Sequence, residues 1–168
     1  MNWFFITVGY SGLAPKAPGT AGSFVSLILG VFILIYLGEE TLFYAALLAM
    51  VAGVKMIDSY EARTQTHDDK RIVIDELVGM WLALAIAPGI KVDPNTLLHV
   101  SNGALIQIIL SFVLFRIYDI KKPSYIGRID RDVQGGIGVM GDDVLAGIAA
   151  GISSALLWQM WLQLEALV

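Results

Sequence analysis

Two pairs of adjacent acidic residues are the groups in this chain best suited to chemistry. Asp75 and Glu76 stand inside the apolar run 72–81, and Asp142 and Asp143 stand directly before another apolar run. Carboxylates in or beside a membrane helix are costly unless they are paired or bind a cation. Oxygen-only ligands suit Mg²⁺, which takes a few carboxylates together with water and substrate phosphate. The predicted metal ligands are Asp68, Asp75, Glu76, Asp142 and Asp143.

Each acidic pair also has a purely structural explanation. Asp75 and Glu76 could sit in the first turn of a helix and interact with its dipole, although Asp75 lies three residues into the apolar run, where a cap would come earlier. An acid before an apolar run is an ordinary N-cap. We therefore expect one residue of Asp142 and Asp143 to cap the following helix. The other then meets Asp75 or Glu76, with Gly147 allowing close approach of the helices.

Basic residues near these acids are spaced to bind phosphate. Arg116, Asp119 and Lys122 follow one another at intervals of three, so they share one face of a helix end. Arginine grips phosphate oxygens in pairs, and such cations stabilise charge on a phosphoryl group. The alternative is a surface ion pair with snorkelling basic side chains. The predicted catalytic residues are Arg116, Asp119, Lys122, Asp130 and Arg131, with Asp119 or Asp130 acting as general base or orienting an arginine.

Two glycine-rich segments could add backbone N–H donors for an anion. Residues 18–23 lead into an apolar run, and a glycine-rich loop at a helix N-terminus can bind phosphate; Ser23 as a plain N-cap explains this segment equally well. Residues 135–138 permit a bend that points N–H groups at an anion, or they form a flexible connector. The predicted substrate-binding residues are Gly19, Thr20, Gly22, Ser23, Arg116, Lys122, Arg131, Gly135 and Gly136.

The elements that must position these groups are apolar helices. Hydrophobic residues make up 57% of the 168 residues, above the about 45–50% of soluble domains. The apolar runs predict helices over residues 23–37, 41–57, 72–87, 97–115 and 144–164. A full membrane span needs about 20 residues; the fourth and fifth runs reach this length, the first does if it starts near Ala17, and the other two are short. We predict an all-α, single-domain membrane bundle of about five apolar helices over residues 1–168.

The distribution of basic residues predicts how this bundle is oriented. Residues 55–71 hold four basic residues and residues 116–143 hold five, whereas the loops around 38–40 and 88–96 hold Lys91 alone. Because cytoplasmic loops are enriched in lysine and arginine, the two basic segments are expected in the cytoplasm. The candidate acids and arginines then gather at one face, which predicts a polar site at the cytoplasmic end.

The composition argues against several other classes of protein. The chain has no cysteine, which excludes disulfides, thiolate metal sites and cysteine nucleophiles. Its net charge of −4 argues against nucleic acid as a partner. The first 12 residues show neither a basic region nor a cleavage site, so we expect no removable signal peptide. Residues 130–133 resemble the nucleophile motif of haloacid-dehalogenase-type phosphatases, but that motif follows a buried strand, and the sequence shows no strand–helix alternation.

Longer motifs occur in order along the chain. They cover residues 12–15, 18–23, 72–81, 115–123, 130–131, 135–140 and 142–147. Together they resemble the phosphatidylglycerophosphatase A family, over about residues 12–151. Asp69 and Lys70 stand where the family often has Pro-Gly, and Tyr125 stands where it often has a second proline. The resemblance implies an all-helical, Mg²⁺-dependent phosphatase that converts the phospholipid phosphatidylglycerol phosphate to phosphatidylglycerol at the cytoplasmic side of the bacterial inner membrane.

Two rival functions remain to be weighed against a lipid phosphatase. A small ion-coupled transporter also uses intramembrane acids, but it requires acids near the bilayer midplane and a path to both faces. Here the acids gather at one end and the opposite loops are nearly bare. A non-catalytic membrane scaffold leaves the cost of the clustered charges unexplained. The sequence sets neither the number of metal ions nor the oligomeric state.

Overall fold

The computed structural model is helical throughout the part of the chain that it describes. That part comprises residues 3–66, 69–87, 103–123, 126, 133 and 135–167. Within it there are six α-helices, one short 3-10 helix and no strand. These elements are α1 (Trp3–Ile6), η1 (Ser11–Leu13), α2 (Pro18–Leu37), α3 (Glu39–Thr64), α4 (Ile74–Ile86), α5 (Ala104–Lys121) and α7 (Gly135–Glu165). The prediction of an all-α fold is confirmed.

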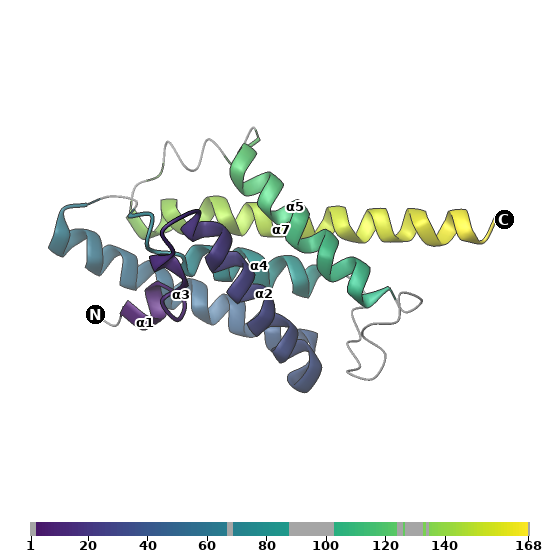
Figure 1. Ribbon diagram of the computed structural model, residues 1–168, viewed down its shortest axis with the longest axis horizontal. Coiled ribbons are helices and arrows are strands. Elements are labelled where there is room, and N and C mark those ends of the chain that lie inside the picture. Colours follow the sequence, from purple (N-terminus) through teal and green to yellow (C-terminus); the bar gives the residue numbers. More distant parts are fainter. Residues whose placement is uncertain are drawn as a thin grey trace.

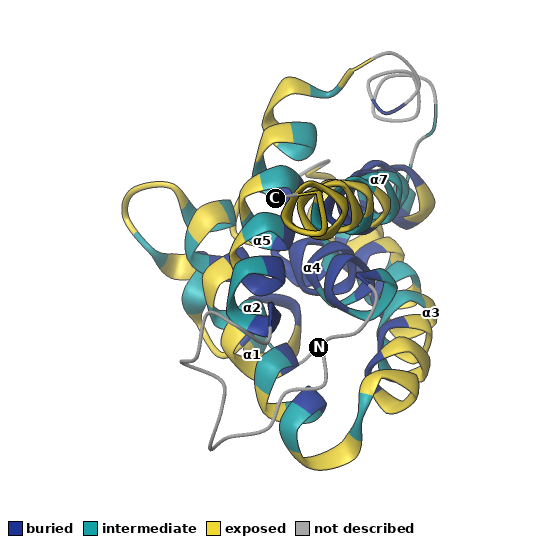
Figure 2. Cartoon of the chain, turned by 90° about the vertical axis from the view of Figure 1, so that its right-hand side faces the viewer, coloured by how far each residue is buried: buried dark blue, intermediate teal, exposed yellow. Residues whose placement is uncertain are grey.

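The short helix α4 forms the centre of the bundle. It packs against α2, α3, α5 and α7, and Figure 2 shows it surrounded by these longer helices. Nine of its 13 residues are buried, which explains why a helix of this length is apolar almost all round. Because α4 begins at Ile74, it carries Asp75 and Glu76 in its first turn. The centre of the fold thus delivers one of the two acidic pairs.

Glycines allow α4 and α7 to pack backbone against backbone. A Cβ atom built on Gly147 of α7 would overlap the carbonyl oxygen of Gly79 on α4, and one built on Gly79 would lie 2.6 Å from the carbonyl oxygen of Asp143. Small residues permit this kind of approach between membrane helices. The contact brings Asp143 directly beside α4, as expected from Gly147.

In the described part of the chain, three helices are long and apolar enough to cross a membrane, by length and composition. They are α2, α3 and α7, with 20, 26 and 31 residues. Large apolar side chains such as Phe32, Tyr44 and Leu48 are exposed on them, the last at 72%. An exposed apolar surface of this extent is typical of a protein that contacts lipid. The C-terminal half of α7 extends beyond the rest of the bundle (Figure 1).

The helix lengths differ from those expected. The second run was expected to give a short helix over residues 41–57, yet α3 has 26 residues and is a candidate span. The fourth run was expected to span, yet α5 has 18 described residues and is not among the three candidates; residues 97–102 lie outside the described part. Helix α2 starts at Pro18 rather than at residue 23, consistent with the preference of proline for a first turn.

Candidate active site

Acidic residues from three helices face one cavity. Asp75 and Glu76 come from α4, Asp119 from α5, and Asp142 and Asp143 from α7. All five line a cavity of about 420 Å³. The two acidic pairs singled out in the sequence are therefore brought together, although Glu76 and Asp142 lie 66 positions apart along the chain.

Within this cavity, Glu76, Asp119 and Asp143 form a compact group of carboxylates. One oxygen atom from each lies within 4.8 Å of the other two. Glu76 and Asp143 are buried, and Asp119 is half-buried. This spacing is compatible with a shared cation. The sequence assigned Asp119 to catalysis rather than to metal binding.

Arg116 links this carboxylate group to two other helices. Its Nη1 lies 2.5 Å from Glu76 Oε2, 2.6 Å from Asp119 Oδ2 and 3.0 Å from Ser23 Oγ. Its Nη2 donates to Thr20 Oγ1 over 3.3 Å. One guanidinium thus joins α2, α4 and α5, and its charge offsets repulsion between the two acids. The explanation of Arg116 and Asp119 as a surface pair does not fit, since both side chains are only 14% exposed.

The segment that begins α2 holds the side chain of Glu76. Ser23 is not an N-cap but lies in the second turn of α2, and its Oγ is 2.5 Å from Glu76 Oε2. A Cβ atom on Gly19 would overlap Glu76 Oε1, so any larger residue there would displace the Glu76 carboxylate. Gly22 likewise lets Val73 approach α2. The glycine-rich segment thus closes over the acid of α4, and Gly19 also lines the cavity.

The second acidic pair lies inside α7 rather than at its start. Helix α7 begins at Gly135, nine residues before the expected start, so the expectation that Asp142 or Asp143 caps this helix is wrong. Lys122, which ends α5 with φ 43°, donates from Nζ to Asp142 Oδ2 over 2.7 Å. The ion pair between Lys122 and Asp142 therefore connects α5 to α7 beside the cavity.

An aspartate of α3 accepts a hydrogen bond from the backbone at the start of α7. The N–H group of Gly136 donates to Asp58 Oδ1 over 2.7 Å. Neither Gly135 nor Gly136 is among the residues lining the cavity, whereas Gly138 is. Substrate binding by Gly135 and Gly136 stays a prediction. The backbone N–H group of Gly136 already has a hydrogen-bond acceptor inside the protein. Sequence reasoning missed Asp58, because it is far from α7 in the sequence and matches no motif.

The arrangement fits a divalent cation. Asp143 Oδ2 is buried and has no hydrogen-bond partner among the described residues, a costly state for a carboxylate oxygen unless a cation satisfies it. The cavity is lined by five carboxylates against two lysines, Lys70 and Lys122. An all-oxygen donor set of this charge suits Mg²⁺. Glu76, Asp119 and Asp143 could hold the ion, with Asp75 and Asp142 close by.

Three predicted site residues cannot be placed. Asp68, Asp130 and Arg131 lie outside the described residues. Their roles in metal binding and catalysis stay predictions from the sequence.

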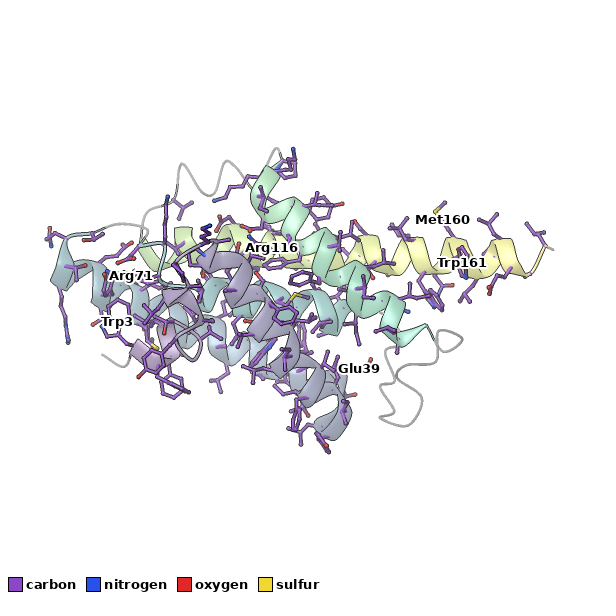
Figure 3. The ribbon with its side chains drawn as sticks, in the orientation of Figure 1. Trp3, Glu39, Arg71, Arg116, Met160 and Trp161 are labelled. Atoms are coloured by element: carbon purple, nitrogen blue, oxygen red, sulfur yellow. The ribbon has the colours of Figure 1, made fainter. Side chains whose placement is uncertain are left out.

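A separate cluster of four side chains lies beside the cavity. Asp69 accepts hydrogen bonds from Arg71 Nε and Nη2 and from Tyr60 Oη. The Arg71 hydrogen bonds hold the pKa of Asp69 well below its usual range, and Asp69 in turn raises the pKa of Arg71. The Arg71 guanidinium lies 5.1 Å from the ring centroid of Trp3. Figure 3 shows Arg71 and Trp3 together at one end of the bundle, far from Glu39 and from Trp161. We call this cluster (Trp3, Tyr60, Asp69 and Arg71) the Asp69 clasp.

The chain is similar to known proteins over most of its length. The family model described as phosphatidylglycerophosphatase A matches residues 4–158. A phosphatidylglycerophosphatase A of Haemophilus influenzae is 36% identical over 148 residues, covering 88% of this chain and 83% of that protein. One of Escherichia coli is 36% identical over 152 residues, covering 89% and 80%.

A third relative has a different name. A putative phosphatidylinositol-3-phosphatase of Bacteroides thetaiotaomicron is 34% identical over 150 residues, covering 87% of this chain and 86% of that protein. No solved structure matches the chain. The match over nearly the whole chain confirms the resemblance found in the motifs. The chain is an enzyme and belongs to the phosphatidylglycerophosphatase A family.

Proposed function

We propose that this enzyme hydrolyses the terminal phosphomonoester of phosphatidylglycerol phosphate, giving phosphatidylglycerol and phosphate, with Mg²⁺ as cofactor. The observation that carries the proposal is the group formed by Glu76, Asp119 and Asp143 from three helices, held beside Arg116 in one cavity. Two relatives at 36% identity carry the name of this activity.

The side chains of the cavity have different roles in the proposed hydrolysis. A bound Mg²⁺ would neutralise the phosphomonoester and lower the pKa of a water molecule. Arg116 presents its guanidinium where negative charge develops on the phosphoryl oxygens, and Lys122 adds a second cation. Water adds to phosphorus as the ester bond breaks, and the glycerol oxygen leaves with a proton as a free hydroxyl group.

Asp119 fits one of its two predicted roles better than the other. Its Oδ2 lies 2.6 Å from Arg116 Nη1, so the carboxylate orients the guanidinium rather than standing free to accept a proton. Asp75 lines the same cavity and is half-buried, and its Oδ1 accepts the Glu76 N–H over 2.9 Å. Proton acceptance therefore falls to Asp130, the other predicted base, or to Asp75.

The membrane supplies the substrate. Helices α2, α3 and α7 are long enough to span. The cavity is lined by Lys70 and Lys122, which belong to the two basic stretches of the sequence. The positive-inside tendency supports a cytoplasmic position for the end of the bundle that holds the cavity, and we propose the bacterial inner membrane as its location. The acyl chains then stay in the bilayer, and only the headgroup enters the cavity.

A phosphoinositide is the second candidate substrate for this cavity. The Bacteroides thetaiotaomicron relative is named for a phosphoinositide, whose headgroup also combines a phosphodiester with a phosphomonoester. The cation-binding group and Arg116 recognise the phosphomonoester and are indifferent to the alcohol that carries it.

The ion-coupled transporter is disfavoured, since its acids should lie between two open faces.

Phosphate release by the purified protein tests the proposal. Short-chain phosphatidylglycerol phosphate, phosphatidylinositol 3-phosphate and phosphatidate are each supplied with Mg²⁺ or with chelator. We expect release from phosphatidylglycerol phosphate at the highest kcat/KM, and loss of release with chelator. A higher kcat/KM on the phosphoinositide would replace the proposed substrate. Undiminished release in chelator would remove the metal from the mechanism.

A further inference from the structure

Lys70 is the cavity-lining cation that the proposed mechanism leaves unused. Lys70 and Lys122 both line the cavity, but Lys122 is bound to Asp142. Lys70 forms no ion pair with any described residue. Its side chain is exposed, whereas Glu76 and Asp143 are buried. A positive charge is therefore available in the outer part of the cavity.

The acid next to Lys70 does not neutralise it. Asp69 Oδ2 lies 2.6 Å from Arg71 Nη2 and 2.5 Å from Tyr60 Oη, and its Oδ1 also accepts the backbone N–H of Arg71. Both carboxylate oxygens are thus engaged within the Asp69 clasp. The positive charge of Lys70 is therefore available to a ligand that binds in the cavity.

The backbone around Lys70 is held on both sides. The Asp69 carbonyl accepts the N–H of Ile72 over 2.8 Å, which closes a turn with Lys70 inside it. The N–H of Val73 donates to the Ile6 carbonyl over 2.9 Å. A Cβ atom on Gly12 would overlap the Arg71 carbonyl oxygen, so the N-terminal segment packs directly on this turn. These contacts present the lysine at a defined place even though its side chain is mobile by nature.

We propose that Lys70 binds the phosphodiester of the lipid headgroup while the terminal phosphate occupies the carboxylate and Arg116 group. This inference rests on the proposed function. The substrate carries two phosphates separated by a glycerol unit, and the cavity is lined both by the buried Glu76 and Asp143 and by the exposed Lys70. A lysine ammonium is a compact point charge that can donate to the non-bridging oxygens of a phosphodiester. Lys70 thereby selects lipids with a phosphodiester over simple phosphomonoesters.

The experiment compares Lys70→Gln with Lys121→Gln, which removes the same charge from an exposed residue outside the cavity. KM and kcat are measured on short-chain phosphatidylglycerol phosphate. Binding of short-chain phosphatidylglycerol, which keeps only the phosphodiester, is measured without turnover. The inhibition constant of inorganic phosphate, which has no phosphodiester, is measured against the same substrate.

We expect Lys70→Gln to raise KM and to weaken phosphatidylglycerol binding, each by about tenfold, as for loss of one charge-assisted hydrogen bond. The values of kcat and of the phosphate inhibition constant should not change, and Lys121→Gln should match the wild type. A weaker inhibition by phosphate with unchanged phosphatidylglycerol binding would overturn the inference, since Lys70 would then bind the terminal phosphate. Equal values in both variants would also overturn it.

The two proposals can fail separately. If the wild type releases no phosphate from phosphatidylglycerol phosphate, the proposed function fails. Weaker phosphatidylglycerol binding by Lys70→Gln would still support the phosphodiester contact in that case. If the wild type is active and Lys70→Gln behaves like it in every measurement, only the role of Lys70 fails.

Discussion

Arg116 and Glu76 are joined by a salt bridge of 2.5 Å between Nη1 and Oε2, across 40 residues of sequence. The same Glu76 oxygen lies 2.5 Å from Ser23 Oγ, so α2, α4 and α5 meet at one carboxylate. Its second oxygen approaches Gly19, where a Cβ atom would not fit. The carboxylate is therefore fixed by its neighbours before any ligand arrives, which is the condition for an efficient metal ligand or transition-state contact.

Replacing Glu76 by glutamine should remove most of the activity. The amide keeps the size of the side chain but loses the charge that would bind the cation and pair with Arg116. We expect kcat to fall by about 100-fold or more, as for loss of a group that acts on the transition state, while the protein still folds and inserts. Phosphate release as a function of Mg²⁺ concentration measures this. Glu40→Gln, an exposed acid on α3 far from the cavity, should match the wild type; wild-type kcat in Glu76→Gln would exclude the carboxylate from the site.

Arg116→Lys tests the guanidinium rather than its charge. Lysine retains a positive charge but cannot reach Glu76, Asp119 and Thr20 at once, as Arg116 does with two nitrogens. We expect kcat/KM to fall by about 10- to 100-fold, because a bidentate donor is lost. Lys121→Arg, the reverse exchange of these two basic residues outside the cavity, should leave kcat/KM unaltered. Equal kcat/KM for Arg116→Lys and wild type would show that charge alone is needed.

Asp143→Asn should change stability in opposite directions with and without metal. The buried Oδ2 of Asp143 has no donor among the described residues, so in chelator the charge costs stability, and its removal should stabilise the fold by about 1–3 kcal/mol. With Mg²⁺ the wild type gains binding energy that the variant lacks. Thermal unfolding in detergent, with chelator and with Mg²⁺, measures both effects. Loss of stability in both conditions would indicate a structural role for the carboxylate.

The helical fold and the meeting of the two acidic pairs could be predicted, because charges in apolar helices must gather where they can be satisfied. Asp75 and Glu76 follow this reasoning, as does Asp143. The part played by Ser23 could not be foreseen. A serine before an apolar run suggests an N-cap, and only the packing of α2 on α4 shows that it faces Glu76.

The start of α7 could not be predicted either. Gly135 and its neighbouring glycines disfavour a helix by their intrinsic propensity, so the segment suggests a loop. The structure offsets this cost with a contact from α3, where Asp58 accepts the Gly136 N–H. Such a contact depends on the tertiary arrangement and leaves no local signal. The same holds for the availability of Lys70, which depends on how Arg71 engages Asp69.

Gly147→Ala should damage both stability and activity. The added methyl group would overlap the Gly79 carbonyl oxygen, forcing α4 and α7 apart at a cost of about 1–3 kcal/mol. Asp143 stands one turn earlier on α7, so its distance to Glu76 should increase and kcat should fall. Unfolding and phosphate release are measured beside Ile152→Ala, a change at an exposed residue of the same helix. Full activity in Gly147→Ala would show that the helices tolerate separation.

The Asp69 clasp predicts how stability depends on pH. Hydrogen bonds from Arg71 lower the pKa of Asp69 in the folded protein, whereas the unfolded chain has a value of about 3.9. A lowered folded pKa means that the clasp stabilises the fold fully above about pH 4 and loses this contribution as the pH falls toward the folded pKa. Asp69→Asn should therefore unfold at a lower temperature than the wild type at pH 7, with a difference that shrinks below about pH 4.

Glu165→Gln, which changes an exposed acid at the end of α7, serves as the control for Asp69→Asn and should show no such trend. A difference between Asp69→Asn and wild type that stays constant from pH 7 to pH 3 would mean that the charge of Asp69 contributes nothing to the clasp.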